Sequence, residues 1–175
     1  MNDYVKGKQQ YTYTHAIQQG FALHRLIDAY TDTHDIIKES KKIFSPTYRL
    51  YSGAITDIIL DYYLAQVMAK QATLTTHTQW VYGTLQQYKA VYTPQYSKVV
   101  NSMQQHDWLS NYQYPWAILK SLQGLQRRAT YITEVDTAYN LWLNNMELLS
   151  TQFTAYWPQL YNYALQAYSK LTNCA

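Results

Sequence analysis

Apolar residues recur every three or four positions along most of this chain, as they do on one face of an amphipathic helix. Leu23, Ile27 and Tyr30 follow this period, and Ile55 and Ile59 repeat it further along. The strict alternation that indicates strands is hard to find, although tyrosine and threonine are abundant. Only four prolines and five glycines interrupt the 175 residues, too few turn signals for a sandwich or a barrel. The pattern therefore predicts an all-α protein.

The helical period and its interruptions also predict where the helices lie. We expect helices near 12–31, 34–44, 47–70, 76–92, 94–105, 114–129 and 134–157, and a last one after Pro158. Pro46 and Pro94 suit the first turn of a helix, and we expect Thr75 or Thr76 to cap the helix that follows. No linker or internal repeat divides the chain, so we expect residues 1–175 to form one domain, a single-domain helical bundle.

Composition and cysteine content restrict the class of protein. Hydrophobic residues make up 47% of the chain and charged residues 14%, a balance that fits a folded globular domain rather than a disordered one. Cys174 is the single cysteine and has no intrachain partner, which favours a reducing compartment. The chain has no apolar stretch long enough for a signal peptide or a membrane span, so we expect a cytoplasmic protein that does not use a membrane.

The positive charges are grouped, although the net charge is only +3. One group lies early in the chain and one follows Gly124; together they are Lys38, Lys41, Lys42, Arg49, Arg127 and Arg128. They fit either contacts with an acidic partner or ordinary solvated helix faces. Because they form no continuous basic stripe, we expect no nucleic-acid partner.

The stretch GFALHRLIDAYTDTH, residues 20–34, is expected to be a core helix, yet it is rich in ionisable side chains. His24 and Asp28 are four residues apart and share one helix face, and Asp32 continues that line. Asp57 and Asp61 repeat the spacing on another apolar helix. Carboxylates buried among apolar side chains need a positive partner, and a metal ion or an arginine is the usual one. The alternative is local: His24 pairs with Asp28, and Asp57 faces solvent.

Other chemical signals are weak. The glycine-rich nucleotide loops, the paired cysteines of zinc sites and the nucleophile elbow of hydrolases are all absent from the sequence. His15, His77 and His106 are isolated, and an isolated histidine is more often a surface or hydrogen-bonded residue than a metal ligand. Spacing by itself leaves the metal-site and surface-pair interpretations open.

Five segments, in order and spacing, resemble the acyl carrier protein phosphodiesterase family. They are DYVKGK, GFALHRLIDAYTDTH, DIILDYYLA, QHDWLSNY and LQGLQRR. The resemblance runs from residue 3 to about residue 130, and the LHRxIDxxTDxH pattern is its specific part. It implies a fold related to the HD-domain phosphohydrolases. It also implies metal-dependent hydrolysis of the phosphodiester between 4′-phosphopantetheine and a serine of acyl carrier protein, with Mn²⁺ as the expected ion.

The resemblance also implies site residues. Transferred position by position, the metal ligands are Asp3, His24, Asp28 and Asp61, and the last three are also the catalytic candidates. Asp32, His34, Asp57 and Tyr62 form a second tier, as partners that orient ligands or as helix caps. We expect the helix with His24 and Asp28 to pack against the helix with Asp61. The basic groups would then dock the acidic carrier protein.

Two departures from the family pattern suggest other functions. Tyr62 stands where the family usually has a histidine, and a neutral phenol is a poor metal ligand near pH 7. Family members usually begin with a further helix before the DYVKGK element, which we expect to be missing here. The alternatives are a catalytically impaired helical module that binds acyl carrier protein or another acidic partner, and an HD-type hydrolase of another phosphoester.

Overall fold

The structure, a computed structural model, describes residues 4–5 and 7–173, and every regular element in this part of the chain is helical. The α-helices are α1 (His15–Thr33), α2 (Asp35–Tyr48), α3 (Ser52–Lys70), α4 (Leu74–Gln87), α5 (Pro94–Gln105), α6 (Trp108–Asn111), α7 (Pro115–Gln126), α8 (Asp136–Asn144) and α9 (Met146–Asn173). Three short 3₁₀ helices are η2 (Gly7–Thr12), η3 (Arg49–Tyr51) and η4 (Lys89–Val91). The all-α prediction is confirmed.

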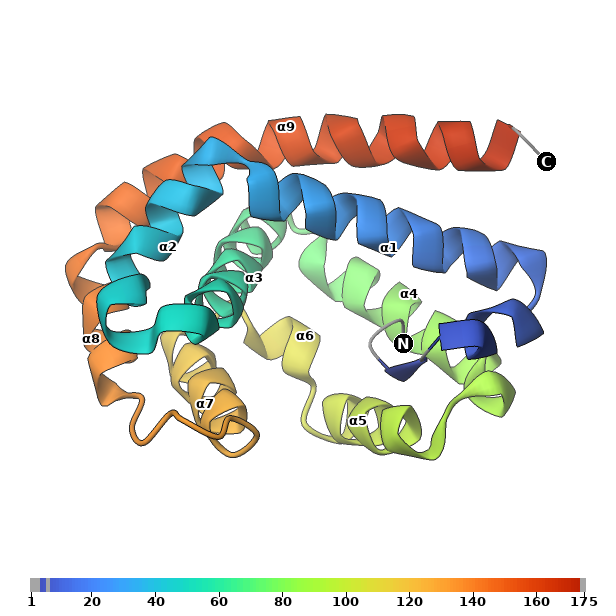
Figure 1. The fold of residues 1–175 in the computed structure, drawn as a ribbon, viewed down its shortest axis with the longest axis horizontal. Helices are drawn as coiled ribbons and strands as arrows, with labels where there is room; N and C mark the ends of the chain where they lie inside the picture. The colour runs from blue at the N-terminus through green and yellow to red at the C-terminus, as the bar shows by residue number, and fades with distance from the viewer. Residues whose placement is uncertain (1–3, 6, 174–175) are drawn as a thin grey trace.

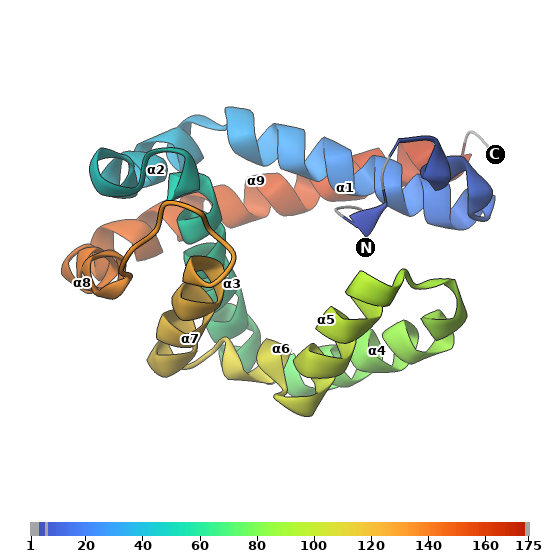
Figure 2. The same ribbon diagram turned by 60° about the horizontal axis from the view of Figure 1, so that its bottom comes forward.

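One hydrophobic core joins α2, α3, α7, α8 and α9. Its centre is formed by fully buried side chains of these helices, among them Phe44, Ile55, Ile59, Leu122 and Trp142. Helix α3 runs through the middle and has buried residues around most of its circumference, which is why its sequence is apolar without a clear polar face. Helices α4, α5 and α6 extend from this core as an arm (Figure 2).

Helices α1 and α9 lie side by side and antiparallel along one side of the molecule (Figure 1). The side-chain amide of Gln19 donates to the carbonyl of Leu171 at 2.6 Å at one end of the pair. The hydroxyls of Thr31 and Tyr156 hydrogen bond at 2.7 Å near the other end. These two contacts fix the register of α1 on α9.

Helix α1 is not the core helix that we expected from its sequence. Phe21 is its only buried residue, and the ionisable residues lie on faces that solvent or a cleft can reach. The chain tolerates so many charges there because α1 lies at the edge of the core, where charged groups keep most of their hydration.

Two proline predictions were wrong. Pro46 lies inside α2, which continues to Tyr48, and Pro158 lies inside the 28-residue α9. Pro46 removes the bond to the Lys42 carbonyl, and the Ser45 hydroxyl, 3.5 Å away, donates to that oxygen instead. The helix break that we expected at Pro158 falls at Asn145, because packing along α1 holds α9 together across the proline. Pro94 does begin a helix, as predicted.

The predicted cap of α4 was also wrong. The helix begins at Leu74, with Thr73 before it, so Thr75 and Thr76 lie in its first turn. Ala72, with φ 55°, ends α3 in the left-handed region and reverses the chain just ahead of this start.

In the part of the chain that the structure describes, no helix is both long enough and apolar enough to cross a membrane.

Candidate active site

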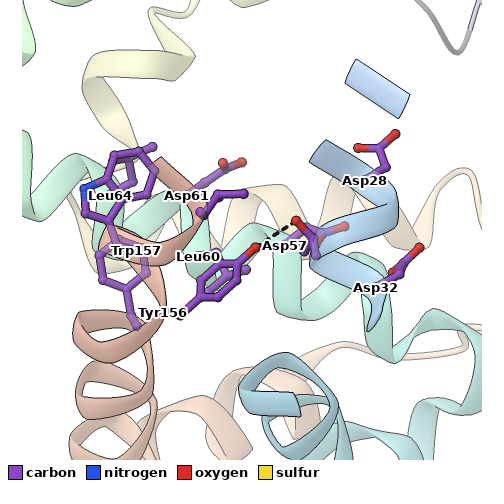
Figure 3. A pocket seen from close by; sticks show the side chains of 11 residues that line it. Asp28, Asp32, Asp57, Leu60, Asp61, Leu64, Tyr156 and Trp157 are labelled. Carbon is purple, nitrogen blue, oxygen red and sulfur yellow. Dashed lines mark hydrogen bonds between the residues drawn. The ribbon is translucent and has the colours of Figure 1, made fainter. Parts of the chain in front are cut away.

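A cleft of about 340 Å³ lies between α1, α3 and α9, and we call it the acidic cleft. Four carboxylates line it, Asp28 and Asp32 from α1 and Asp57 and Asp61 from α3. Figure 3 shows Asp28 and Asp32 on α1, Asp57 and Asp61 on α3, and the side chain of Tyr156 on α9 pointing toward the space that they line. The cleft therefore gathers residues from three helices that are far apart in the sequence.

The expected packing of α1 against α3 is only partly met. Helix α1 makes its closest contacts with α9 and α2, while α3 packs chiefly on α2 and α7. The aspartates of α1 and α3 thus face each other across a cavity rather than within a tight helix pair. That arrangement leaves room for a ligand between the two carboxylate pairs.

Asp57 and Asp61 stand one helical turn apart on α3, so both carboxylates point to the same side. Both residues are exposed to solvent at the cleft, although nearby protein atoms exclude part of the water around their carboxylates. This partial loss of hydration raises the pKa of Asp57 to about 6 and that of Asp61 to about 7. Repulsion from Asp57 adds to the rise in the pKa of Asp61. Both groups would ionise more readily beside a cation.

On the α1 wall, His24 and Asp28 form the local pair that their spacing predicts. His24 Nδ1 lies 2.7 Å from Asp28 Oδ2, and the two side chains are 43% and 54% exposed. The pair is at the surface, and its carboxylate lines the cleft. Such an arrangement fits both a ligand pair and an ordinary surface interaction.

The second-tier residues divide between the cleft and other places. Asp32 lines the cleft and pairs with Lys41 Nζ at 2.7 Å. His34 is a helix cap, one of its two expected roles, because its Nδ1 accepts the Ile36 N–H at 3.3 Å. Its ring also packs against Tyr156.

Tyr62 lies in the core and is not among the residues that line the cleft. It is 7% exposed and packs edge-on against Trp142, with ring centroids 5.2 Å apart. One residue after Asp61, it points about 100° further round the helix. Because α3 is embedded, that direction leads into the core and away from the carboxylates. The structure therefore does not bring Tyr62 to the site.

The donor set of the cleft suits a hard divalent ion better than a soft one, because it consists of carboxylate oxygens with one imidazole beside them. In residues 4–5 and 7–173, however, no three His, Cys, Asp or Glu side chains come close enough together to hold a metal ion. Asp3, the remaining predicted ligand, lies outside the described residues. The donor types suit an ion such as Mn²⁺, but the described side chains do not by themselves form a three-ligand cluster.

The basic residues that we expected to dock a partner behave in two ways. The lysines of α2 each contact a nearby carboxylate, in the pairs Lys38–Asp35 at 2.9 Å, Lys41–Asp32 at 2.7 Å and Lys42–Glu39 at 2.6 Å. Arg49 is exposed just after α2, with φ 47°. Arg127 and Arg128 instead line a second cleft beside α7. The local ion pairs reduce the positive field of α2.

Sequence reasoning did not find the contribution of α9. One face of α9 lines the cleft with Phe153, Tyr156, Trp157 and Leu160. Lys41 of α2 borders the cleft through its ion pair with Asp32. These four apolar and aromatic residues of α9 follow the i, i+3, i+4, i+7 period of one helix face. This period would have predicted an apolar face, but not which helix it covers.

Known proteins are similar to this chain over most of its length. The sequence profile of the family described as acyl carrier protein phosphodiesterase matches residues 1–160. The chain belongs to this family. The acyl carrier protein phosphodiesterase of Photorhabdus laumondii is 25% identical over 169 residues, which cover 95% of this chain and 83% of that protein. The one from Klebsiella pneumoniae is 26% identical over 163 residues, 91% of this chain and 84% of that protein.

A higher local identity is found with the acyl carrier protein phosphodiesterase of Pectobacterium atrosepticum, 36% over 66 residues, or 38% of this chain and 34% of that protein. No solved structure matches the fold. The relationship to HD-domain phosphohydrolases therefore stays a prediction. Within this acyl carrier protein phosphodiesterase family member, the segments 20–34 and 57–65 supply the two facing walls of the acidic cleft.

Proposed function

We propose that this chain is a metal-dependent phosphodiesterase that hydrolyses the bond between 4′-phosphopantetheine and a serine of acyl carrier protein. One observation carries the proposal. The two segments that most resemble the family meet across one cleft and place four carboxylates around it. Membership of the family supports the substrate.

We assign the ion to His24, Asp28 and Asp61, with Asp3 as a further ligand. A bound divalent ion of the Mn²⁺ type would polarise a phosphoryl oxygen and lower the pKa of a water molecule. Asp32 and Asp57 would orient the ligands, and Lys41 would hold Asp32 in place through their 2.7 Å ion pair. Tyr156 and Trp157 would form an apolar wall that limits water on the α9 side of the cleft.

The test is release of phosphopantetheine from holo-acyl carrier protein in the presence of Mn²⁺, compared between the wild type, Asp61→Asn and Asp35→Asn. Asp35 is a matched control because it is an exposed carboxylate on α2. We expect release by the wild type and by Asp35→Asn, and a loss of at least about 100-fold in Asp61→Asn. Equal rates in all three proteins would remove Asp61 from the site.

A second candidate function is a binding module that no longer hydrolyses the carrier protein. It is favoured by the absence of three clustered ligands among the described residues. In that case holo-carrier protein would bind without release of its prosthetic group, and Mn²⁺ would leave the melting temperature unchanged. Hydrolysis of small phosphodiesters without turnover of the carrier protein would instead indicate an HD-type hydrolase of another phosphoester.

A further inference from the structure

A second cleft, of about 720 Å³, lies between α5, α6 and α7, and we call it the basic cleft. Trp116, Lys120 and Gly124 of α7 are spaced by four residues and line it along one helix face. Arg127 lies beside this wall, because a Cβ added at Gly124 would make ordinary contact with Arg127 Nη2, 3.6 Å away. The volume lies within the range of sites for small organic ligands, about 300–1,000 Å³.

The basic cleft has a concentrated positive charge. Lys98, Lys120, Arg127 and Arg128 line it and are exposed, and no acidic side chain is among the described residues that line it. None of these four cations forms an ion pair with a described carboxylate. This differs from α2, whose lysines are each paired locally. The Arg128 Nε–H donates to the Gly124 carbonyl at 3.2 Å, which leaves its terminal nitrogens available to a ligand.

Apolar surface accompanies this charge. Trp108, Tyr112 and Trp116 line the same cleft, and Trp116 is 51% exposed. A small inorganic anion would leave these rings in water. An anion that carries an extended organic arm would satisfy both parts of the cleft.

The basic cleft adjoins the acidic cleft through α3. Ile58 lines the basic cleft, and Asp61, three residues later on the neighbouring face of the helix, lines the acidic one. Tyr112 also lines the basic cleft. The two clefts thus share α3 as a common wall.

We propose that the basic cleft binds the phosphopantetheine arm, with the phosphate at the end formed by Tyr112 and Arg128 and the pantetheine part against Trp108 and Trp116. The choice of ligand rests on the proposed function. The location of the site rests on the unpaired cations and the aromatic lining of the cleft. An acidic surface of the carrier protein is the competing occupant, but a concave cleft of this volume fits a single arm better.

The experiment measures binding of free phosphopantetheine, of pantetheine without its phosphate and of inorganic phosphate by titration calorimetry. The variant is the double reversal Lys120→Glu with Arg128→Glu. Its matched control is Lys170→Glu, a charge reversal in the last turn of α9, remote from α7 (Figure 1). We expect phosphopantetheine to bind the wild type about tenfold or more tightly than pantetheine or phosphate, and the double reversal to remove that preference. The control should retain it.

A second measurement does not depend on the variants folding. In the wild type, phosphopantetheine should shift the amide resonances of α7, 115–126, more than those of α1, 15–33. Equal affinity for phosphopantetheine and pantetheine, or shifts confined to α1 and α9, would overturn the proposal. So would a double reversal that weakens binding of the carrier protein lacking its arm but leaves phosphopantetheine binding unchanged.

The outcomes for the site and for the activity are separable. If the wild type binds phosphopantetheine in the basic cleft but releases none from the carrier protein, the proposed activity fails and the site stands. If the double reversal releases the arm at the wild-type rate and with the wild-type KM, the site fails and the activity stands.

Discussion

Lys41 Nζ lies 2.7 Å from Asp32 Oδ1, so a lysine of α2 neutralises one carboxylate of the acidic cleft. The Lys41 side chain is only 21% exposed and passes close to Gly53 of α3. It also lowers the pKa of Asp57, against the larger effect of lost hydration. Lys41 thus borders the acidic cleft through its contact with Asp32.

Replacement of Lys41 by methionine should destabilise the protein near neutral pH. The change removes the ion pair with Asp32 and the cation that lowers the pKa of Asp57, so we expect a loss of about 0.5–1 kcal/mol at pH 8. The loss should be smaller at pH 4, where Asp57, with its pKa raised to about 6, is protonated. Urea unfolding at both pH values measures the difference. Lys38→Met, which removes an exposed pair, is the control and should change stability little. Equal losses in the two variants at pH 8 would contradict a special role for Lys41.

Stability without metal should fall as pH rises from about 4 to about 7. Asp57 and Asp61 have pKa values raised to about 6 and about 7, so the folded state holds their protons more tightly than the unfolded state does. Their contribution is fully present below the unfolded pKa and is lost as pH passes the folded values. After allowance for solvent in the cleft, Asp61→Asn should gain about 1 kcal/mol at pH 8, or roughly 2–4 °C, and nothing at pH 4. Thermal melts across this range provide the measurement, and a variant no more stable than the wild type at pH 8 would contradict the raised pKa.

Mn²⁺ should raise the melting temperature of the wild type, and more at pH 8 than at pH 5. A ligand that binds only the folded state at about 100 times its Kd adds about 2.7 kcal/mol. Asp28→Asn and Asp61→Asn should lose most of this gain, since each removes an assigned ligand, whereas Asp35→Asn should keep it. If Mn²⁺ protects all four proteins equally, the ion binds elsewhere.

Tyr62→His should cost packing energy and give no gain in metal binding. The ring is buried against Tyr63 and Trp142, so we expect a loss of about 1–3 kcal/mol. Tyr62→Phe keeps the ring and should stay close to the wild type. The measurements are urea unfolding and Mn²⁺ titration. A histidine variant with tighter Mn²⁺ binding would show that this position reaches the site after all.

Local periodicity carried most of the fold prediction. The helices α1, α3, α5 and α7 fall near their expected positions because their apolar spacing is a signal that acts within a few residues. The errors at Pro46 and Pro158 arose where tertiary contacts outweighed a local signal. A proline costs a helix one hydrogen bond, which packing of α9 on α1 can offset.

For the candidate site, the i, i+4 spacing of His24 and Asp28, and of Asp57 and Asp61, put each pair on one helix face. Spacing did not show that the two faces meet, because that depends on how α1 and α3 are oriented on α2 and α9. Spacing also did not show that Asp61 points to the cleft while Tyr62 points into the core. One residue of rotation on an embedded helix sends the first side chain to the cleft and the second into the core.

By itself, the sequence determined the all-helical class, the resemblance to the family and the carboxylate pairs, since all three depend on residue types at short spacings. The tertiary structure decided which charges are neutralised. Lys41 and Asp32, nine residues apart, meet at the junction between α1 and α2, while Lys98 and Arg128, thirty residues apart, share a cleft that no described carboxylate lines. Charge pairing depends on distances of a few ångströms between helices, and only the packing of the core sets those distances.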